Sequence, residues 1–238
     1  MAIPLHHEVA SLLIAQNLRK VAFTGSGGKT SLILGVSHVL REAGVLITTT
    51  TKLASVDDVD YPVDDIALDP ATIPAISKGK TTLWAKPGQK LRPVDQDLLH
   101  TVSQGANVIL IEADGARSRA LTFHQEGEPV IPTWVDGVVC VVGLGAIGKE
   151  LSEETMHRYN RYRRETGSKE RAVTQKTLET LLTHPDGVLK GCANHTTIVV
   201  FTQCDVVDQS ISEAAIALAK KERRISYVVA GSNKGEHE

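Results

Sequence analysis

The stretch Val21-Ala22-Phe23-Thr24-Gly25-Ser26-Gly27-Gly28-Lys29-Thr30-Ser31 decides the fold class. Its first three residues form a short apolar run typical of a buried strand. Apolar side chains then recur at helical spacing after the glycines, at Leu32, Ile33, Val36, Val39 and Leu40. A glycine-rich loop between a strand and a helix N-terminus is a phosphate-binding arrangement, because its backbone N–H groups converge on an anion.

The loop carries side chains suited to a nucleoside triphosphate such as ATP or GTP. We expect Gly25, Ser26, Gly27, Gly28 and Ser31 to surround the phosphates. Lys29 would reach the β- and γ-phosphates, and Thr30 would offer its hydroxyl to Mg²⁺. The common pattern has a glycine where this chain has Phe23, so a simple glycine turn with an exposed lysine is the alternative.

Further apolar runs predict the rest of an α/β sheet. They are 45–47, 82–84, 108–111, 138–142, 198–201 and 227–229, and several lack the alternation of half-exposed strands. We therefore predict a mainly parallel sheet flanked by helices, P-loop NTPase-like, with ligands at the carboxyl ends of the strands. The 238 residues would form one domain, with an inserted helical subdomain at about 151–190. The acidic, turn-rich segment 55–74 is expected to leave the sheet.

Composition narrows the range of partners and the cellular location. The formal net charge of −2 gives no bulk electrostatic reason to expect a nucleic acid or an anionic membrane as partner. Cys140, Cys192 and Cys204 form no Cys-x-x-Cys pair for a metal or redox site. No stretch predicts a leader peptide or a membrane span, so we expect a cytoplasmic protein.

Two acids and a threonine run follow predicted strands. Glu112 and Asp114 follow the predicted strand 108–111. We expect them to be catalytic together with Lys29, and to hold the metal ion together with Thr30. An acidic turn is the alternative. The run 48–51 and Lys52 end another strand, and Thr50 and Lys52 are candidate contacts to phosphate or substrate, although threonine also commonly finishes a strand.

A base pocket is predicted near the C-terminal end. Thr202-Gln203-Cys204-Asp205 follows one strand and Ala230-Gly231-Ser232 the next, an order that resembles the guanine-reading part of GTPases. Asp205 would accept hydrogen bonds from the base. Thr202 and Gln203 replace the Asn and Lys of that pattern, so base preference stays open, and a helix-capping aspartate is the alternative.

Together, the motifs resemble those of the YqeC family. They are T-G-S-G-G-K-T, T-T-T-T-K-L, I-E-A-D-G-A, E-P-V-I-P, a glycine-rich turn after V-V-G, and M-H-R, in this order between about 21 and 205. The resemblance implies an accessory factor for selenium-dependent molybdenum hydroxylases with a P-loop-like nucleotide site. It also implies a second site facing a small anionic molecule or the hydroxylase apoprotein, with candidates Arg117, Arg119, Glu128, His157 and Arg158. For the basic run 158–171, a solvent-facing helix is the alternative.

Three functions fit these patterns. The first is a Mg²⁺-dependent NTPase that acts as a maturation factor and is reset by hydrolysis. The second is an ATP-dependent kinase or ligase for a small anionic substrate, since T-G-x-x-G-K-T also occurs in Mur-type ligases. The third is a non-catalytic nucleotide-binding partner module.

Overall fold

Eight parallel strands form the central sheet of the computed structural model, which describes residues 3–57, 59–69, 73–115 and 119–232. The strands are β1 (Lys20–Gly25), β2 (Val45–Thr49), β3 (Asp65–Ala67), β4 (Thr81–Trp84), β5 (Val108–Glu112), β7 (Gly137–Gly143), β9 (Thr196–Thr202) and β10 (Tyr227–Ala230). Their order is β10-β9-β7-β1-β5-β2-β4-β3. The predicted parallel α/β fold is confirmed, with β1 between β7 and β5.

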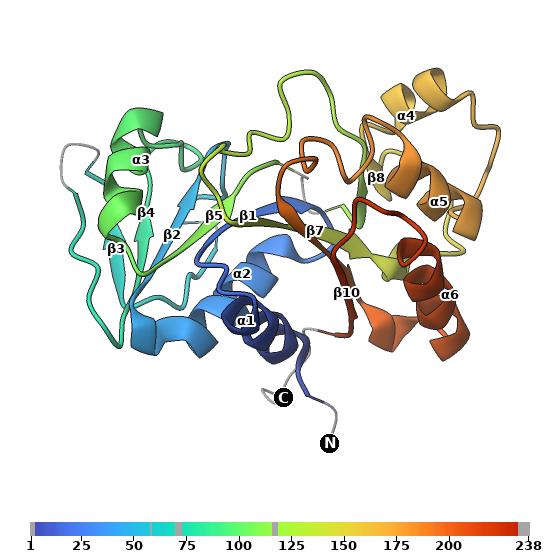
Figure 1. Cartoon of the computed structure of the whole chain (residues 1–238). Helices are drawn as coiled ribbons and strands as arrows, with labels where there is room; N and C mark the ends of the chain where they lie inside the picture. The colour runs from blue at the N-terminus through green and yellow to red at the C-terminus, as the bar shows by residue number, and fades with distance from the viewer. Residues whose placement is uncertain (1–2, 58, 70–72, 116–118, 233–238) are drawn as a thin grey trace.

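Helices cover both faces of the sheet (Figure 1). They are α1 (Leu5–Ala15), α2 (Lys29–Leu40), α3 (Gln96–Gly105), α4 (Tyr159–Thr166), α5 (Gln175–Thr183) and α6 (Gln209–Ala219). The helices α1 and α2 pack on one face, and α3, α5 and α6 pack on the other. Successive residues of a strand alternate between these two cores, as in β1, where Val21 and Phe23 face α1 and α2 and Ala22 faces the other side. Burial on both faces explains the continuous apolar runs.

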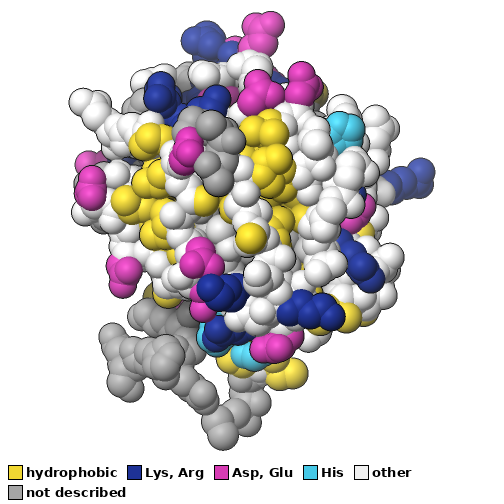
Figure 2. All heavy atoms as spheres, turned by 90° about the vertical axis from the view of Figure 1, so that its left-hand side faces the viewer, with side chains coloured by type: hydrophobic (Ala, Val, Ile, Leu, Met, Phe, Trp, Pro, Cys, Tyr) yellow, Lys and Arg dark blue, Asp and Glu magenta, His cyan; other side chains and the backbone are white. Residues whose placement is uncertain are grey.

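Two segments, 151–190 and 55–74, add elements to the sheet and its covering helices. Segment 151–190 holds α4, α5 and the short strand β8 (Met156–His157), which pairs with β6 (Leu121–Thr122) in a separate two-stranded sheet. The expectation that the acidic segment 55–74 leaves the sheet is wrong for β3, which pairs with β4 at the edge of the main sheet and leaves Ile66 45% exposed. Figure 2 views the molecule from this edge and shows hydrophobic side chains gathered at its centre, with charged side chains around them.

Candidate functional site

The glycine-rich loop passes from the end of β1 to the start of α2. Gly25, Gly27 and Gly28 have positive φ angles of 86°, 93° and 102°. A Cβ at Gly25 would lie 2.1 Å from the Val141 carbonyl oxygen, and one at Gly27 would lie 2.5 Å from the Gly143 Cα. Only glycine tolerates a positive φ angle together with such a close approach to β7, so this loop conformation requires glycine at positions 25 and 27.

Polar contacts from β7 and β9 hold this loop. The Ser26 N–H donates to the Val141 carbonyl at 2.9 Å, and the Thr202 hydroxyl donates to the Gly27 carbonyl. The Ser26 hydroxyl is buried and has no hydrogen-bond partner among the described residues. A buried polar atom without a partner is costly in a folded protein, so a hydroxyl left open in this loop fits a ligand that accepts or donates a hydrogen bond.

Lys29 is buried against two acids. Its ammonium group donates to the side chain and the main-chain carbonyl of Asp114, and it lies 3.6 Å from Glu112 Oε1. Burial alone lowers the pKa of Lys29, but the charges of Asp114 and Glu112 outweigh it and leave the pKa raised. The lysine is therefore held charged at the first residue of α2.

Glu112 connects the end of β5 with the first turn of α2. Its Oε2 accepts a hydrogen bond from the Thr30 hydroxyl at 2.9 Å. Burial raises the pKa of Glu112, although Lys29 and the Thr30 hydrogen bond act in the opposite direction. A hydroxyl and a carboxylate that meet at the phosphate loop are oxygen donors of the kind that Mg²⁺ prefers.

Asp114 occupies the centre of the cluster. Its Oδ2 accepts from the Gly25 N–H at 2.7 Å and lies 2.8 Å from Nε2 of His124. Burial alone raises the pKa of Asp114, but the Lys29 charge and the His124 hydrogen bond lower it to about 2. Asp114 is thus an ionised anchor for both the loop backbone and Lys29.

His124 is a part of the site that sequence reasoning missed. It is fully buried, and its Nδ1 lies 2.8 Å from the Gly187 carbonyl oxygen. The ring therefore connects Asp114 with the segment after α5. No local signal marks this contact, because His124 stands ten residues after Asp114 in a segment without helical or strand periodicity.

The threonine run serves mainly to hold the ends of neighbouring strands. The hydroxyls of Thr48, Thr49 and Thr50 donate to the carbonyls of Trp84, Glu112 and Val130 at 2.8, 2.9 and 2.7 Å. The Thr51 hydroxyl, in contrast, is buried without a partner among the described residues. The run therefore ties β2 to β4, β5 and the Val130 segment, and leaves one hydroxyl open.

A cleft of about 1660 Å³ opens above these residues. Its lining contains the predicted site residues Ser26, Gly27, Gly28, Lys29, Thr30, Ser31, Lys52, Glu112, Arg119, Glu128, His157 and Arg158. Thr50 contacts Glu112 and Asp114 contacts Lys29, both in this lining, and Gly25 contacts Asp114; none of the three is part of the lining itself. Arg117 lies outside the described residues.

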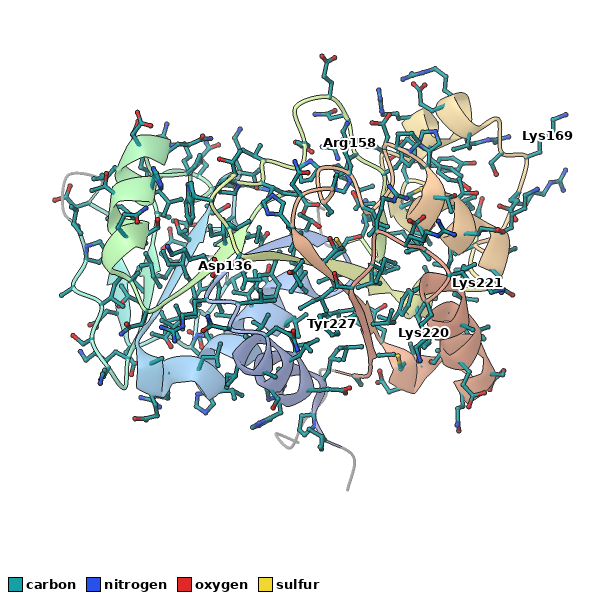
Figure 3. The ribbon with its side chains drawn as sticks, in the orientation of Figure 1. Asp136, Arg158, Lys169, Lys220, Lys221 and Tyr227 are labelled. Carbon is teal, nitrogen blue, oxygen red and sulfur yellow. The ribbon has the colours of Figure 1, made fainter. Side chains whose placement is uncertain are left out.

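Arg158 is the residue of the basic run that reaches the cleft. Its Nη2 donates to Glu128 Oε2, whereas its Nη1 is buried without a partner among the described residues. Figure 3 shows Arg158 in the upper part of the molecule, and Lys169 extending outward at its right-hand side. Of the other cations in the run, half-buried Arg161 pairs with Asp186, and the rest are exposed: Arg163, Arg164, Lys169 and Arg171.

Asp205 lies apart from the cleft lining. It is exposed, and its Oδ1 accepts from the Ser232 hydroxyl at 2.7 Å. Gln203, two residues earlier, does line the cleft, and its Oε1 lies close to Gly143 and Gly145. The two strand ends predicted to read a base are therefore joined to each other, with Gln203 nearest the cleft.

The described residues include no group of three or more His, Cys, Asp or Glu side chains that could hold a metal ion. In the same part of the chain, no helix has the length and apolar content needed to cross a bilayer.

The fold and the loop define an α/β protein of the P-loop NTPase-like class. Residues 21–160 match the model of the family described as YqeC protein, and the chain belongs to this family. It is similar to "Uncharacterized protein YqeC" of Escherichia coli (strain K12), with 33% identity over 199 residues that cover 78% of this chain and 77% of the relative. No solved structure matches it.

Proposed function

We propose that the chain binds a nucleoside triphosphate, ATP or GTP, with Mg²⁺ on 25–31 and hydrolyses it. In this proposal it acts as an accessory or maturation factor for a selenium-dependent molybdenum hydroxylase. The observation that carries the nucleotide part is the cluster of buried Lys29, Glu112 and Asp114 with half-buried Thr30, beside a loop of three positive-φ glycines. Such a cluster offers a cation and a pair of metal-binding oxygens at the N-terminus of α2, where an anion is favoured.

The contacts support a different role for each acid. Both oxygens of Asp114 already accept hydrogen bonds, from Gly25, His124 and Lys29, so this residue positions the loop and the lysine. Glu112 meets Thr30 at the lining of the cleft, and these two residues would hold the metal ion. Bound Mg²⁺ would neutralise charge on the phosphates.

Lys29 would exchange partners when nucleotide binds. It contacts Asp114 in this structure, and the β- and γ-phosphates would compete for the same ammonium group. Asp114 keeps the Gly25 and His124 contacts in either case. Hydrolysis would follow from in-line attack of water on the γ-phosphorus, which forms one P–O bond and breaks the bond to the β-phosphate oxygen.

The maturation role rests on the family. The chain belongs to the YqeC family, and the resemblance of its motifs implies work on selenium-dependent molybdenum hydroxylases. A slow NTPase that is reset by hydrolysis fits such a role, because the nucleotide state can time the binding and release of a partner.

Calorimetry and product analysis test the proposal together. ATP, GTP and CTP are titrated with and without Mg²⁺, and NDP and free phosphate are then measured. NDP and phosphate without a modified acceptor support the NTPase. A phosphorylated or ligated acceptor supports the kinase or ligase, and binding without turnover supports the partner module. Absence of binding for all three nucleotides would overturn the nucleotide site.

A further inference from the structure

One wall of the cleft carries positively charged side chains that have no role in the proposed nucleotide site. This wall consists of Thr51, Lys52, Lys90, Arg92 and Arg158, all of which line the cleft. We call it the basic wall. None of these five residues belongs to the phosphate loop or to the cluster of Glu112 and Asp114.

Hydrogen bonds between three separate segments assemble the basic wall. The Leu53 N–H donates to the Leu91 carbonyl at 3.0 Å, which places Lys52 beside the segment with Lys90 and Arg92. The Thr50 hydroxyl donates to the Val130 carbonyl at 2.7 Å, two residues from Glu128, the partner of Arg158. The fold therefore brings these cations to the lining of one cleft, although they stand far apart in the sequence.

The charges of the basic wall are mostly unbalanced. Lys52, Lys90 and Arg92 are exposed and form no ion pair with a carboxylate of the described residues. Among the described residues, the Arg92 guanidinium donates only to the Pro87 carbonyl, at 3.3 and 3.2 Å. Three cations that form no ion pair with the described residues, in a concave site, favour a ligand with more than one negative charge.

Two hydrogen-bond donors of the basic wall are buried but donate to no described residue. The Thr51 hydroxyl and Arg158 Nη1 have no hydrogen-bond partner among the described residues. The other end of the Arg158 guanidinium is fixed by Glu128. A guanidinium held on one side and open on the other is preorganised to bind an oxyanion.

The sheet order places the basic wall beside the metal end of the phosphate loop. The Thr50 N–H donates to the Glu112 carbonyl at 3.0 Å, and Glu112 accepts from Thr30. Gln203 follows β9, which lies on the other side of β1 from β2. A nucleotide whose base lies towards Gln203 would point its γ-phosphate towards the basic wall.

The size of the cleft leaves room for a second molecule. Its volume of about 1660 Å³ exceeds the roughly 300–1,000 Å³ of a typical small-molecule site. We propose that the basic wall binds the phosphate group of a second, phosphorylated small molecule, next to the γ-phosphate end of the nucleotide. The placement of this site next to the γ-phosphate rests on the function proposed above, whereas the existence of the phosphate site does not.

Inorganic phosphate is the probe for a calorimetric test. The chain is first saturated with Mg²⁺ and a non-hydrolysable NTP analogue, so that the phosphate loop is filled, and phosphate is then titrated. We expect one further phosphate per chain. The double variant Lys90→Ala/Arg92→Ala should weaken this binding about tenfold and leave the affinity for the analogue unchanged.

Lys220→Ala/Lys221→Ala is the matched control. It also removes two exposed cations, but neither of these lines the cleft, and Figure 3 shows them well below Arg158, so phosphate binding should stay unchanged. The proposal is overturned if the saturated chain binds no phosphate, or if both double variants weaken binding equally.

The same titration on chain without nucleotide separates this proposal from the nucleotide site. If the analogue does not bind but Lys90→Ala/Arg92→Ala still weakens phosphate binding, the proposed function fails and the phosphate site stands. If the analogue binds and displaces all phosphate, the basic wall belongs to the nucleotide, and the second ligand is excluded.

Discussion

The Thr30 hydroxyl donates to Glu112 Oε2 at 2.9 Å and thereby joins the first turn of α2 to the end of β5. These two side chains come from segments 82 residues apart, and both line the cleft. In the proposed function these two oxygens would hold Mg²⁺.

Thr30→Val should remove the benefit of Mg²⁺ for nucleotide binding, because valine keeps the shape of threonine but has no hydroxyl. We expect the NTP·Mg²⁺ affinity to fall about tenfold, and the affinity measured in EDTA to stay unchanged. Thr30→Ser, which keeps the hydroxyl, is the control and should retain the Mg²⁺ effect. Equal Mg²⁺ effects in all three proteins would contradict the assignment.

Lys29→Ala should lose nucleotide binding and also lower stability, because two buried carboxylates lose their cation. Breaking a buried pair costs about 3 kcal/mol. Lys29→Ala/Asp114→Asn removes one charge of each sign and should regain part of that stability without regaining binding. Thermal unfolding and calorimetry on both variants check this. A double variant that is less stable than Lys29→Ala would argue against the pairing.

The fold and the phosphate loop could be predicted because their signals are local. The apolar runs reflect strands buried on both faces, and the glycines reflect positive φ angles at the turn between β1 and α2. The family prediction, made from short motifs, is also confirmed. The predicted binding roles of Lys29, Thr30 and Glu112 stay predictions, although the structure brings these residues together.

The remaining features depend on contacts that no short pattern records. β3 has only three residues and no apolar run, so its place at the sheet edge follows from pairing with β4. His124 and the basic wall arise where distant loops meet above the sheet. Lys90 and Arg92 lie in a turn-rich segment, and the bridge between Leu53 and Leu91 holds them beside Lys52 at the cleft.

Gly27→Ala should disrupt the phosphate loop. The residue has φ of 93°, and an added Cβ would lie 2.5 Å from backbone atoms of Gly143. Gly148→Ala is the control for backbone strain alone, because Gly148 has φ of 80° but nothing within 4 Å of the added Cβ. The positive φ angle costs an alanine about 1 kcal/mol at either position. The clash with Gly143 adds a further cost at Gly27 only. Urea unfolding should show a larger loss for Gly27→Ala; equal losses would contradict the close approach.

Asp114 should make stability depend on pH in the acid range. Its pKa is about 2 in the folded chain, below the usual 3.8, so the unfolded chain takes up the proton first. The stabilisation is therefore present above about pH 4 and lost as the pH falls to about 2. Asp114→Asn should remove about 2 kcal/mol of that pH dependence. Urea unfolding at several pH values tests this, and parallel curves for the two proteins would contradict it.

Asp205 should affect the choice of base more than the binding of phosphates. It follows β9, its carboxylate is held by the Ser232 hydroxyl after β10, and it lies outside the cleft lining that contains the phosphate loop. Asp205→Ala should therefore change the relative affinities for ATP, GTP and CTP and leave the affinity for tripolyphosphate unchanged. Gln203→Ala is the companion variant, because Gln203 lines the cleft itself. If the three nucleotides bind equally before and after Asp205→Ala, Asp205 does not read the base. A shift in preference with Gln203→Ala alone would then place the base beside Gly143 and Gly145, where the Gln203 side chain lies.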